Sequence, residues 1–207
     1  MEIICRGAES IIYLDTWEEQ EVLVKERIKK GYRVKQIDEK LRKLRTRQEI
    51  KLLTGARKCG VNTPKILNVD EVNHKIFMEN VKGKRIKELF YSADEKTIEE
   101  ICFEIGESIG KLHSNGIAHG DITTSNMILE HKKIYFIDFG LGKFSNRIED
   151  FGIDLNLLYE ALKSTHFKIL KICWDNILKG YKKEYKGSNK ALKKVEEIEK
   201  RARYAKR

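Results

Sequence analysis

His119-Gly120-Asp121-Ile122-Thr123-Thr124-Ser125-Asn126 is the stretch that decides the fold, and Asp138-Phe139-Gly140 follows twelve residues after Asn126. Asp121, Asn126 and Asp138 are polar residues expected on tight loops at strand ends. Asn126 and Asp138 have the side-chain oxygens that a magnesium ion prefers, so they are the candidate metal ligands. Asp121 is the candidate catalytic residue, which would orient a phosphate acceptor and take up its proton. Gly140 is expected to let the backbone turn sharply after Asp138.

The residues before this stretch predict a small sheet with one long helix. Apolar residues at mostly helical spacing predict the helix from Val34 to Lys58, and Pro64, the only proline, lies beyond its end. Short β-favouring runs separated by turns predict strands over residues 1–6, 11–14, 21–25, 65–70 and 75–79.

The rest of the chain is predicted to be mainly helical. An apolar stripe with helical spacing begins after Asp94, a candidate N-cap, and ends before Gly116. Residues 127–129 and 134–137 predict a hairpin, and residues 149–164, 167–182 and 189–205 predict helices. We therefore expect an α+β fold with a β-rich lobe over residues 1–80 and a helical lobe over residues 81–207.

Composition excludes several classes of protein. Hydrophobic residues make up 41% of the 207 residues and charged residues 36%, which excludes a disordered polyelectrolyte and a membrane bundle. No apolar run approaches the ~18 residues of a membrane span, and the N-terminus lacks a secretory leader, so we expect a cytoplasmic protein. The cysteines lack the close spacing of a zinc site and are expected to be reduced core residues, at positions 5, 59, 102 and 173.

The two loop motifs, in this order behind a β-rich lobe, resemble the catalytic and metal-binding loops of the protein kinase fold. The resemblance implies ATP and Mg²⁺ as cofactors and a strand lysine on the nucleotide phosphates, for which Lys25 in Val22-Leu23-Val24-Lys25 is the candidate. A carboxylate of the long helix should pair with that lysine. Glu49 is preferred to Glu39, because apolar neighbours place Glu49 on the core-facing side of the helix.

Three further residues are candidate nucleotide contacts by their position. Gly7 lies in Gly7-Ala8-Glu9-Ser10, where kinases have a glycine-rich loop over the phosphates, although a simple hairpin turn is the equal alternative. Glu79 and Val81 fall where kinases pass between lobes and pair with adenine through backbone groups.

Several features depart from ordinary protein kinases. Gly120 replaces the arginine that binds a phosphorylated activation loop, so that form of regulation is not expected. Thr123 stands where serine/threonine kinases usually have a lysine on the transferring phosphate, so slow transfer or help from a partner is expected. Only 53 residues follow Asp154, which is too few for the usual peptide-binding platform.

The departures match one branch of this fold. The chain resembles the small atypical kinase of the KEOPS complex, the PRPK family, over nearly its whole length, and His119 to Asn126 is the most specific part. The family implies a role in threonylcarbamoyladenosine modification of tRNA. It also implies two partners, the threonylcarbamoyltransferase subunit and a small regulatory subunit. Some archaea fuse the transferase and the kinase, so whether this chain is a domain of a longer protein stays open.

Positive charge is concentrated in two blocks. Lys and Arg number 42 against 32 Asp and Glu. Residues 27–58 hold 13 basic and 3 acidic side chains, and residues 182–207 hold 11 and 4. The first block is interpreted as a solvated helix face that also docks a partner. The tail from Lys200 to Arg207 is a candidate tRNA contact, with a frayed basic terminus as the alternative.

Three functions are compatible with these features. The first is an ATP-dependent enzyme that phosphorylates a protein serine or hydrolyses ATP, and the family resemblance favours hydrolysis. The second is a kinase-fold scaffold that binds tRNA and partners. The third is a small-molecule phosphotransferase, which would normally need a longer helical region. The joint presence of Lys25, Asp121, Asn126 and Asp138 argues against a dead site.

Overall fold

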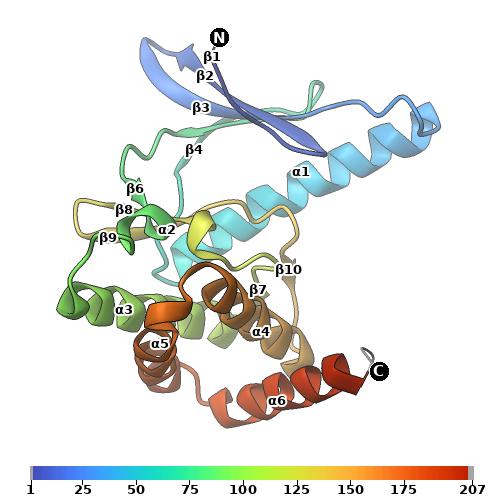
Figure 1. Cartoon of the computed structure of the whole chain (residues 1–207). Helices are drawn as coiled ribbons and strands as arrows, with labels where there is room; N and C mark the ends of the chain where they lie inside the picture. Colours follow the sequence, from blue (N-terminus) through green and yellow to red (C-terminus); the bar gives the residue numbers. More distant parts are fainter. Residues whose placement is uncertain (1, 205–207) are drawn as a thin grey trace.

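The computed structural model describes residues 2–204 and has two lobes, a sheet with one long helix above and a bundle of helices below (Figure 1). The elements of the first lobe are β1 (Glu2–Arg6), β2 (Ser10–Trp17), β3 (Gln20–Arg27), α1 (Lys35–Lys58), β4 (Ile66–Asp70) and β5 (Lys75–Glu79). The chain then passes to the second lobe between the end of β5 and β6 (Lys84–Arg85).

The upper sheet is antiparallel, with the strand order β1-β2-β3-β5-β4. Side chains alternate between its two faces, as the period of two requires. Val22 and Val24 of β3 pack with Tyr13 on one face. Lys25 and Arg27, at the intervening positions, are also buried. The register pairs Lys25 with Ile12 of β2 and Ile76 of β5, so the predicted lysine lies in the middle of the sheet.

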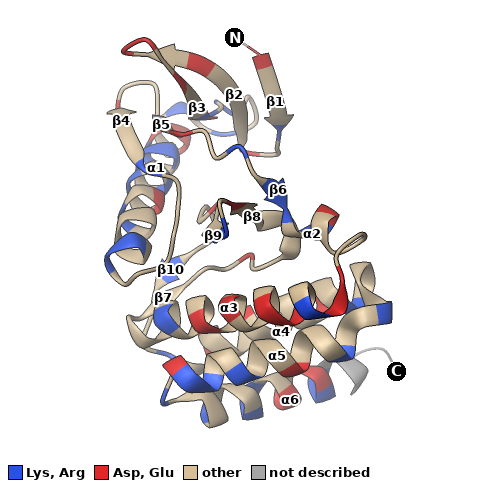
Figure 2. Cartoon of the chain, turned by 90° about the vertical axis from the view of Figure 1, so that its left-hand side faces the viewer, with Lys and Arg blue, Asp and Glu red and all other residues tan. Residues whose placement is uncertain are grey.

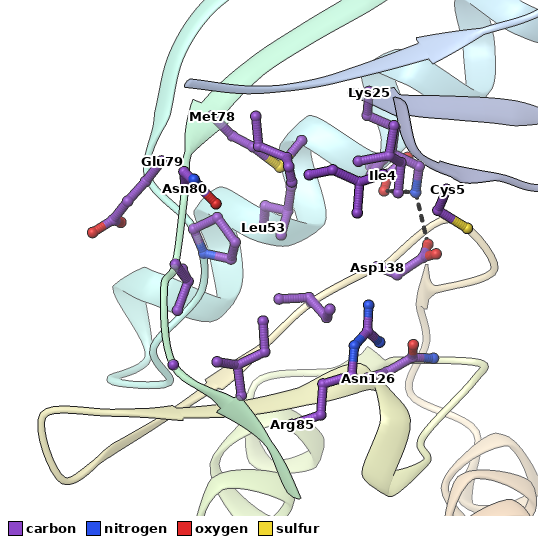
Figure 3. A pocket seen from close by; sticks show the side chains of 18 residues that line it. Ile4, Cys5, Lys25, Leu53, Met78, Glu79, Asn80, Arg85, Asn126 and Asp138 are labelled. Carbon is purple, nitrogen blue, oxygen red and sulfur yellow. Dashed lines mark hydrogen bonds and ion pairs between the residues drawn. The ribbon is translucent and has the colours of Figure 1, made fainter. Parts of the chain in front are cut away.

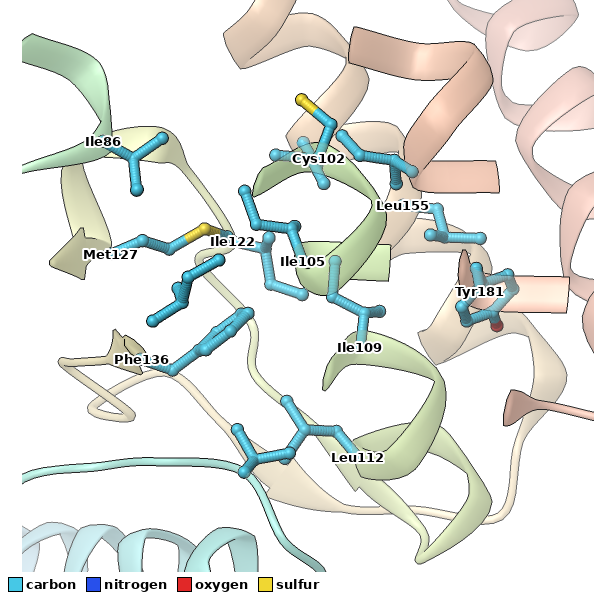
Figure 4. Close-up of a cluster of buried hydrophobic side chains, with 14 of the residues drawn as sticks. Ile86, Cys102, Ile105, Ile109, Leu112, Ile122, Met127, Phe136, Leu155 and Tyr181 are labelled. Atoms are coloured by element: carbon cyan, nitrogen blue, oxygen red, sulfur yellow. The ribbon is translucent and has the colours of Figure 1, made fainter. Parts of the chain in front are cut away.

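The lower lobe is mainly helical and holds the larger apolar core. Its helices are α2 (Ile86–Leu89), α3 (Glu95–Ser114), α4 (Ile148–Thr165), α5 (Leu170–Glu184) and α6 (Ser188–Tyr204). Its strands are β6, β7 (Ile117–Ala118), β8 (Met127–Glu130), β9 (Lys133–Phe136) and β10 (Lys143–Phe144), with 3-10 turns at Thr124–Asn126 and Phe167–Ile169. The core includes the buried side chains of Ile105 and Ile109 on α3, together with Ile122 and Met127 (Figure 4).

The predicted elements agree with the structure in their order and type. Asp94 caps α3 as predicted, because its carboxylate accepts a hydrogen bond from Thr97 N at 2.8 Å. α5 begins at Leu170, three residues later than predicted, because a 3-10 turn precedes it. The short pieces β6, α2, β7 and β10 were not predicted, since segments of two to four residues carry too little periodicity.

The cysteine prediction was partly wrong. All four are free thiols, and Cys102 and Cys173 are buried as expected. Cys5, however, is exposed, because it lies on β1, an edge strand of the sheet. Among the helices that the structure describes, none combines the length and hydrophobicity that crossing a bilayer requires.

Candidate active site

A cavity of about 310 Å³ lies between the two lobes (Figure 3). Its walls are mostly apolar, with a few polar groups, which is typical of nucleotide and other small-molecule sites. Lys25, Asp138 and Asn126 lie toward one end, whereas Glu79 and Asn80 lie toward the other (Figure 3). The apolar lining includes Ile4, Ile12, Leu23, Leu53, Pro64, Met78, Val81, Ile128 and Ile137.

Lys25 occupies the centre of the polar end. Its Nζ lies 2.6 Å from Glu49 Oε1 and 2.7 Å from Asp138 Oδ1, so one ammonium connects β3, α1 and the Asp138 loop. Burial disfavours the charged amine, but the two carboxylates outweigh burial and raise the pKa of Lys25 above its ordinary value. The lysine is therefore a fixed cation at neutral pH.

The structure pairs Lys25 with Glu49 and not with Glu39. Glu49 is 2% exposed, whereas Glu39 lies on the exposed side of α1. Arg27, which sequence reasoning missed, donates from Nη2 to Glu49 Oε2 at 2.6 Å. Each oxygen of the Glu49 carboxylate thus has its own cation, as a buried carboxylate needs.

Asp121 and Asn126 are joined within one short loop. Asn126 Nδ2 donates to Asp121 Oδ2 at 2.8 Å and to the Asp121 carbonyl at 2.9 Å. The turn is also closed by the backbone, where Asn126 N donates to Thr123 O at 3.0 Å. Because the amide nitrogen is used in these bonds, the Asn126 side chain presents its oxygen away from Asp121.

The sharp turn at the second motif lies at Asp138 and not at Gly140. Asp138 has a φ of 62°, in the left-handed region, whereas Gly140 has no such angle. Glycine at 140 instead gives room, since an added Cβ would lie 3.0 Å from Asp138 Oδ1 and 3.5 Å from Lys25 Nζ. The prediction that Gly140 provides the sharp turn was therefore wrong, because the left-handed backbone angle lies at Asp138. Burial opposes ionisation, but the charge of Lys25 and the Gly140 N–H lower the pKa of Asp138.

Asp154 of α4 holds the start of the candidate catalytic loop, residues 119–126. Its carboxylate accepts hydrogen bonds from His119 N at 2.6 Å and Gly120 N at 2.8 Å, and it lies 3.3 Å from His113 Nε2. His119 is fully buried, and its ring centroid lies 4.3 Å from that of Phe139. The two motifs of the sequence are thus fixed to each other and to α4.

The three remaining predicted nucleotide contacts have different positions. Glu79 and Val81 line the cavity. The Glu79 carboxylate accepts from Lys65 N at 3.0 Å outside it, so the backbone is what this residue offers a ligand. Gly7 is not among the lining residues; its N–H donates to Ser10 O at 2.9 Å in the turn between β1 and β2. A role for Gly7 stays a prediction.

Arg85, at the end of β6, is a second lining residue that sequence reasoning missed. Its Nη1 donates to the carbonyl of Ser125 at 2.5 Å, so it connects the start of α2 to the catalytic loop. The side chain lies beside Asn126 in the cavity (Figure 3). In the sequence, only its position just after the crossing between the lobes could have indicated that Arg85 lines the cavity.

The donor set suits a magnesium ion that is bound together with phosphates. Asp138 and Asn126 supply one carboxylate and one amide oxygen to the same cavity as Lys25. No group of three or more His, Cys, Asp or Glu side chains suited to a metal occurs among residues 2–204. Mg²⁺ usually keeps several waters and takes one or two protein carboxylates plus substrate phosphates, so the residues present fit it.

Known proteins resemble this chain over its whole length. The family model described as "Protein kinase domain" matches residues 2–165. The KEOPS complex subunit Bud32 of Pyrococcus abyssi is 47% identical, over 100% of this chain and 98% of that protein. A probable bifunctional tRNA threonylcarbamoyladenosine biosynthesis protein of Methanothermobacter thermautotrophicus is 44% identical over 98% of this chain. The chain spans 36% of that longer relative, and 37% of the one from Methanocaldococcus jannaschii, which is 41% identical.

Proposed function

The chain belongs to the protein kinase family and, within it, to the family of the KEOPS complex subunit Bud32, and we propose that its cavity binds ATP with Mg²⁺ and releases the terminal phosphate. The family membership confirms the resemblance and the kinase-like α+β fold predicted from the sequence. Membership also makes the protein a kinase-type or ATPase-type phosphotransferase. The reaction, the cofactors and the partners of this chain are the proposal.

The observation that carries the proposal is the contact of Lys25 with both Glu49 and Asp138, in the cavity that Asn126 also lines. In this arrangement Lys25 would bind the nucleotide phosphates, and Asn126 and Asp138 would hold the metal. Bound Mg²⁺ neutralises charge that develops on the phosphate oxygens. The apolar end of the cavity would enclose the base, with backbone groups at Glu79 and Val81 for hydrogen bonds.

Water is the acceptor that we favour. Asp121 would orient the acceptor oxygen, and its carboxylate is already held by Asn126 at 2.8 Å. The segment between Gly140 and the start of α4 at Ile148 contains only the short strand β10, so it offers little surface on which a peptide substrate could lie. Transfer to a protein serine is the alternative, and it requires that another subunit present that serine.

The proposed partners are the threonylcarbamoyltransferase subunit, the small regulatory subunit and tRNA. KEOPS and tRNA threonylcarbamoyladenosine biosynthesis appear in the names of the relatives, which supports action within a multi-subunit complex. Lys and Arg residues recur along α1 (blue on the ribbon in Figure 2), and their positive charge suits a partner rich in phosphate or carboxylate.

The experiment is a measurement of ATP turnover by the purified chain, alone, with each KEOPS subunit and with tRNA, in the presence and absence of Mg²⁺. We expect Mg²⁺-dependent release of phosphate that increases when the transferase subunit is added. Binding of Mg-ATP without turnover under every condition would contradict the enzymatic proposal and favour the scaffold. Transfer of phosphate to a serine of another subunit would show that this serine, and not water, is the acceptor.

A further inference from the structure

Arg27 is a buried arginine that bridges two carboxylates. It is the last residue of β3, two positions after Lys25 on the same face of the strand, and is 5% exposed. Its Nη2 lies 2.6 Å from Glu49 Oε2, and its Nη1 lies 3.8 Å from Glu9 Oε2. Burying a guanidinium is costly unless charged partners surround it, so its environment is built around these two contacts.

Glu9 connects the other end of this bridge to the turn between β1 and β2. Its carboxylate also forms ion pairs with Arg33, at 3.2 Å, and with Arg45 of α1. The Glu9 carbonyl accepts a hydrogen bond from Ile28 N at 3.2 Å. The turn is thereby attached to the end of β3 and to α1 through both its backbone and its side chain.

The bridge gives the Glu49 carboxylate a second charged partner besides Lys25. Lys25 occupies Oε1 of Glu49, and Arg27 occupies Oε2. If Lys25 shares its charge with nucleotide phosphates, Glu49 still has Arg27 as a charged partner on its other oxygen, so its buried carboxylate stays compensated. Gly120 stands where other kinases have the arginine that binds a phosphorylated loop, so a contact through Arg27 would order this site without phosphorylation.

We propose that Arg27 is a positioning residue: by bridging Glu49 and Glu9, it holds α1 and the β1–β2 turn in place over the phosphate end of the nucleotide before the ligand arrives. This inference rests on the proposed function, because it assigns a role in nucleotide placement at the same site. Glu9 is then the residue that attaches the β1–β2 turn to β3 and α1.

The test compares Arg27→Met, Arg27→Lys and Glu9→Gln with the wild-type chain. We expect Arg27→Met to lower kcat/KM for ATP about tenfold to a hundredfold, as removal of a charge-assisted hydrogen bond would. Arg27→Lys retains the charge but cannot reach both carboxylates, so its effect should be smaller. Arg147→Met is the matched control, because it removes an exposed arginine that pairs with Glu149 at 3.3 Å outside the cavity. Its kcat/KM should stay within about twofold of wild type, as expected for an exposed ion pair.

Ligand binding separates positioning from general damage to the fold. The bridge acts at the phosphate end, so Arg27→Met and Glu9→Gln should weaken binding of Mg-ADP but leave adenosine binding unchanged. In the Glu9→Gln/Arg27→Lys double variant the losses of affinity should be less than additive, because both changes break one bridge. If Arg27→Met does not fold, the proposal is tested with Glu9→Gln. This substitution alters a partly exposed side chain in a turn and should leave the fold intact.

Two results would overturn the inference. One is wild-type kcat/KM in both Arg27→Lys and Glu9→Gln, and the other is an equal weakening of adenosine and Mg-ADP binding. Failure of the proposed function looks different, since the wild-type chain itself would then neither bind Mg-ADP nor turn over ATP. That result would remove this inference with it.

Discussion

Glycine at position 120 is required by its backbone conformation and by its surroundings. Its φ is +81°, and a Cβ at this position would lie 2.3 Å from the carbonyl oxygen of Leu141. The N–H of Gly120 also donates to the Asp154 carboxylate. Because Gly120 directly precedes Asp121, a shift of its backbone would displace the candidate catalytic residue.

Gly120→Ala should therefore destabilise the protein by roughly 1–3 kcal/mol and lower ATP turnover. The matched control is Gly31→Ala, where nothing lies within 4 Å of an added Cβ and φ is ordinary. Denaturant unfolding and turnover of both variants check this prediction. Equal stability of the two would show that the loop relaxes around a methyl group at little cost.

At Asp138, a single substitution can remove the charge of the candidate metal-binding loop without changing the size of the side chain. Its φ of 62° is one that asparagine tolerates better than most residues, so Asp138→Asn should leave the backbone in place. The substitution removes the carboxylate that faces Lys25, and with it the proposed metal ligand.

We expect Asp138→Asn to abolish Mg²⁺-dependent ATP turnover in a folded protein. Circular dichroism and thermal unfolding establish the fold, and phosphate release measures turnover. Asp175→Asn, on the exposed side of α5, is the control and should behave as wild type. Undiminished hydrolysis by folded Asp138→Asn would exclude Asp138 as a required ligand.

At the scale of the elements, two buried histidines connect α3, the catalytic loop and α4. Burial lowers the pKa of His113 on α3, although Asp154 opposes this effect. Burial likewise lowers the pKa of His119, against the opposing charges of Asp154, Asp138 and Asp121. Both histidines therefore prefer to be neutral in the folded protein.

The sign of the resulting pH dependence follows from linkage. The unfolded histidines take up protons near pH 6.5, whereas the folded ones do so only at lower pH, so the unfolded state binds more protons in between. The free energy of unfolding should thus fall as the pH drops below about 6.5, by at most roughly 1 kcal/mol per pH unit for each histidine. His74 and His166, whose pKa values burial also lowers, add to the same slope.

Denaturant unfolding at pH 7.5, 6.5 and 5.5 checks this expectation. Asp38, Asp70 and Asp138 have lowered pKa values, and their contributions are lost mainly below about pH 4, outside this range. Burial raises the pKa of Glu104, which opposes the effect of the histidines within the range. His131→Gln, at an exposed hairpin, serves as the control and should retain the wild-type slope. A free energy of unfolding that is constant from pH 7.5 to 5.5 would contradict the assignment.

At the scale of the whole molecule, the excess positive charge is distributed over both lobes and is partly neutralised. Several arginines of the first block pair with carboxylates, as Arg42 does with Asp38 at 2.8 Å. In the second block, Arg201 lies 3.7 Å from Glu149 and 3.8 Å from Glu197. Beyond residue 204 the basic tail lies outside the described residues.

Deleting residues 200–207 should weaken tRNA binding. The deletion removes five positive charges, so the slope of log affinity against log salt should flatten by roughly 0.7 to 0.9 for each tRNA phosphate that the tail neutralises in the full chain. Turnover of ATP without tRNA should stay unchanged, because none of the described residues of the tail lines the cavity. The affinity is measured at several salt concentrations, for the chain alone and in its complex. Identical slopes with and without the tail would mean that these charges are merely solvated.

The sequence by itself determined the two-lobed α+β fold and the candidates at the centre of the site. Motif spacing identified Asp121, Asn126 and Asp138, and the resemblance to the protein kinase fold pointed to Lys25 at the end of an apolar strand. The apolar neighbours of Glu49 distinguished it from Glu39. These inferences were possible because periodicity and loop spacing are properties of short stretches of chain, and such stretches dictate local structure.

Only the tertiary structure decided which distant groups meet. Arg27, Glu9 and Glu49 belong to three different elements, and nothing in the spacing of 42 basic residues singles out Arg27. The left-handed backbone at Asp138 and the exposure of Cys5 were equally invisible. The physical reason is that burial creates these contacts. A charge enters the interior only where folding brings its partner within hydrogen-bond distance, and that depends on the packing of the whole chain.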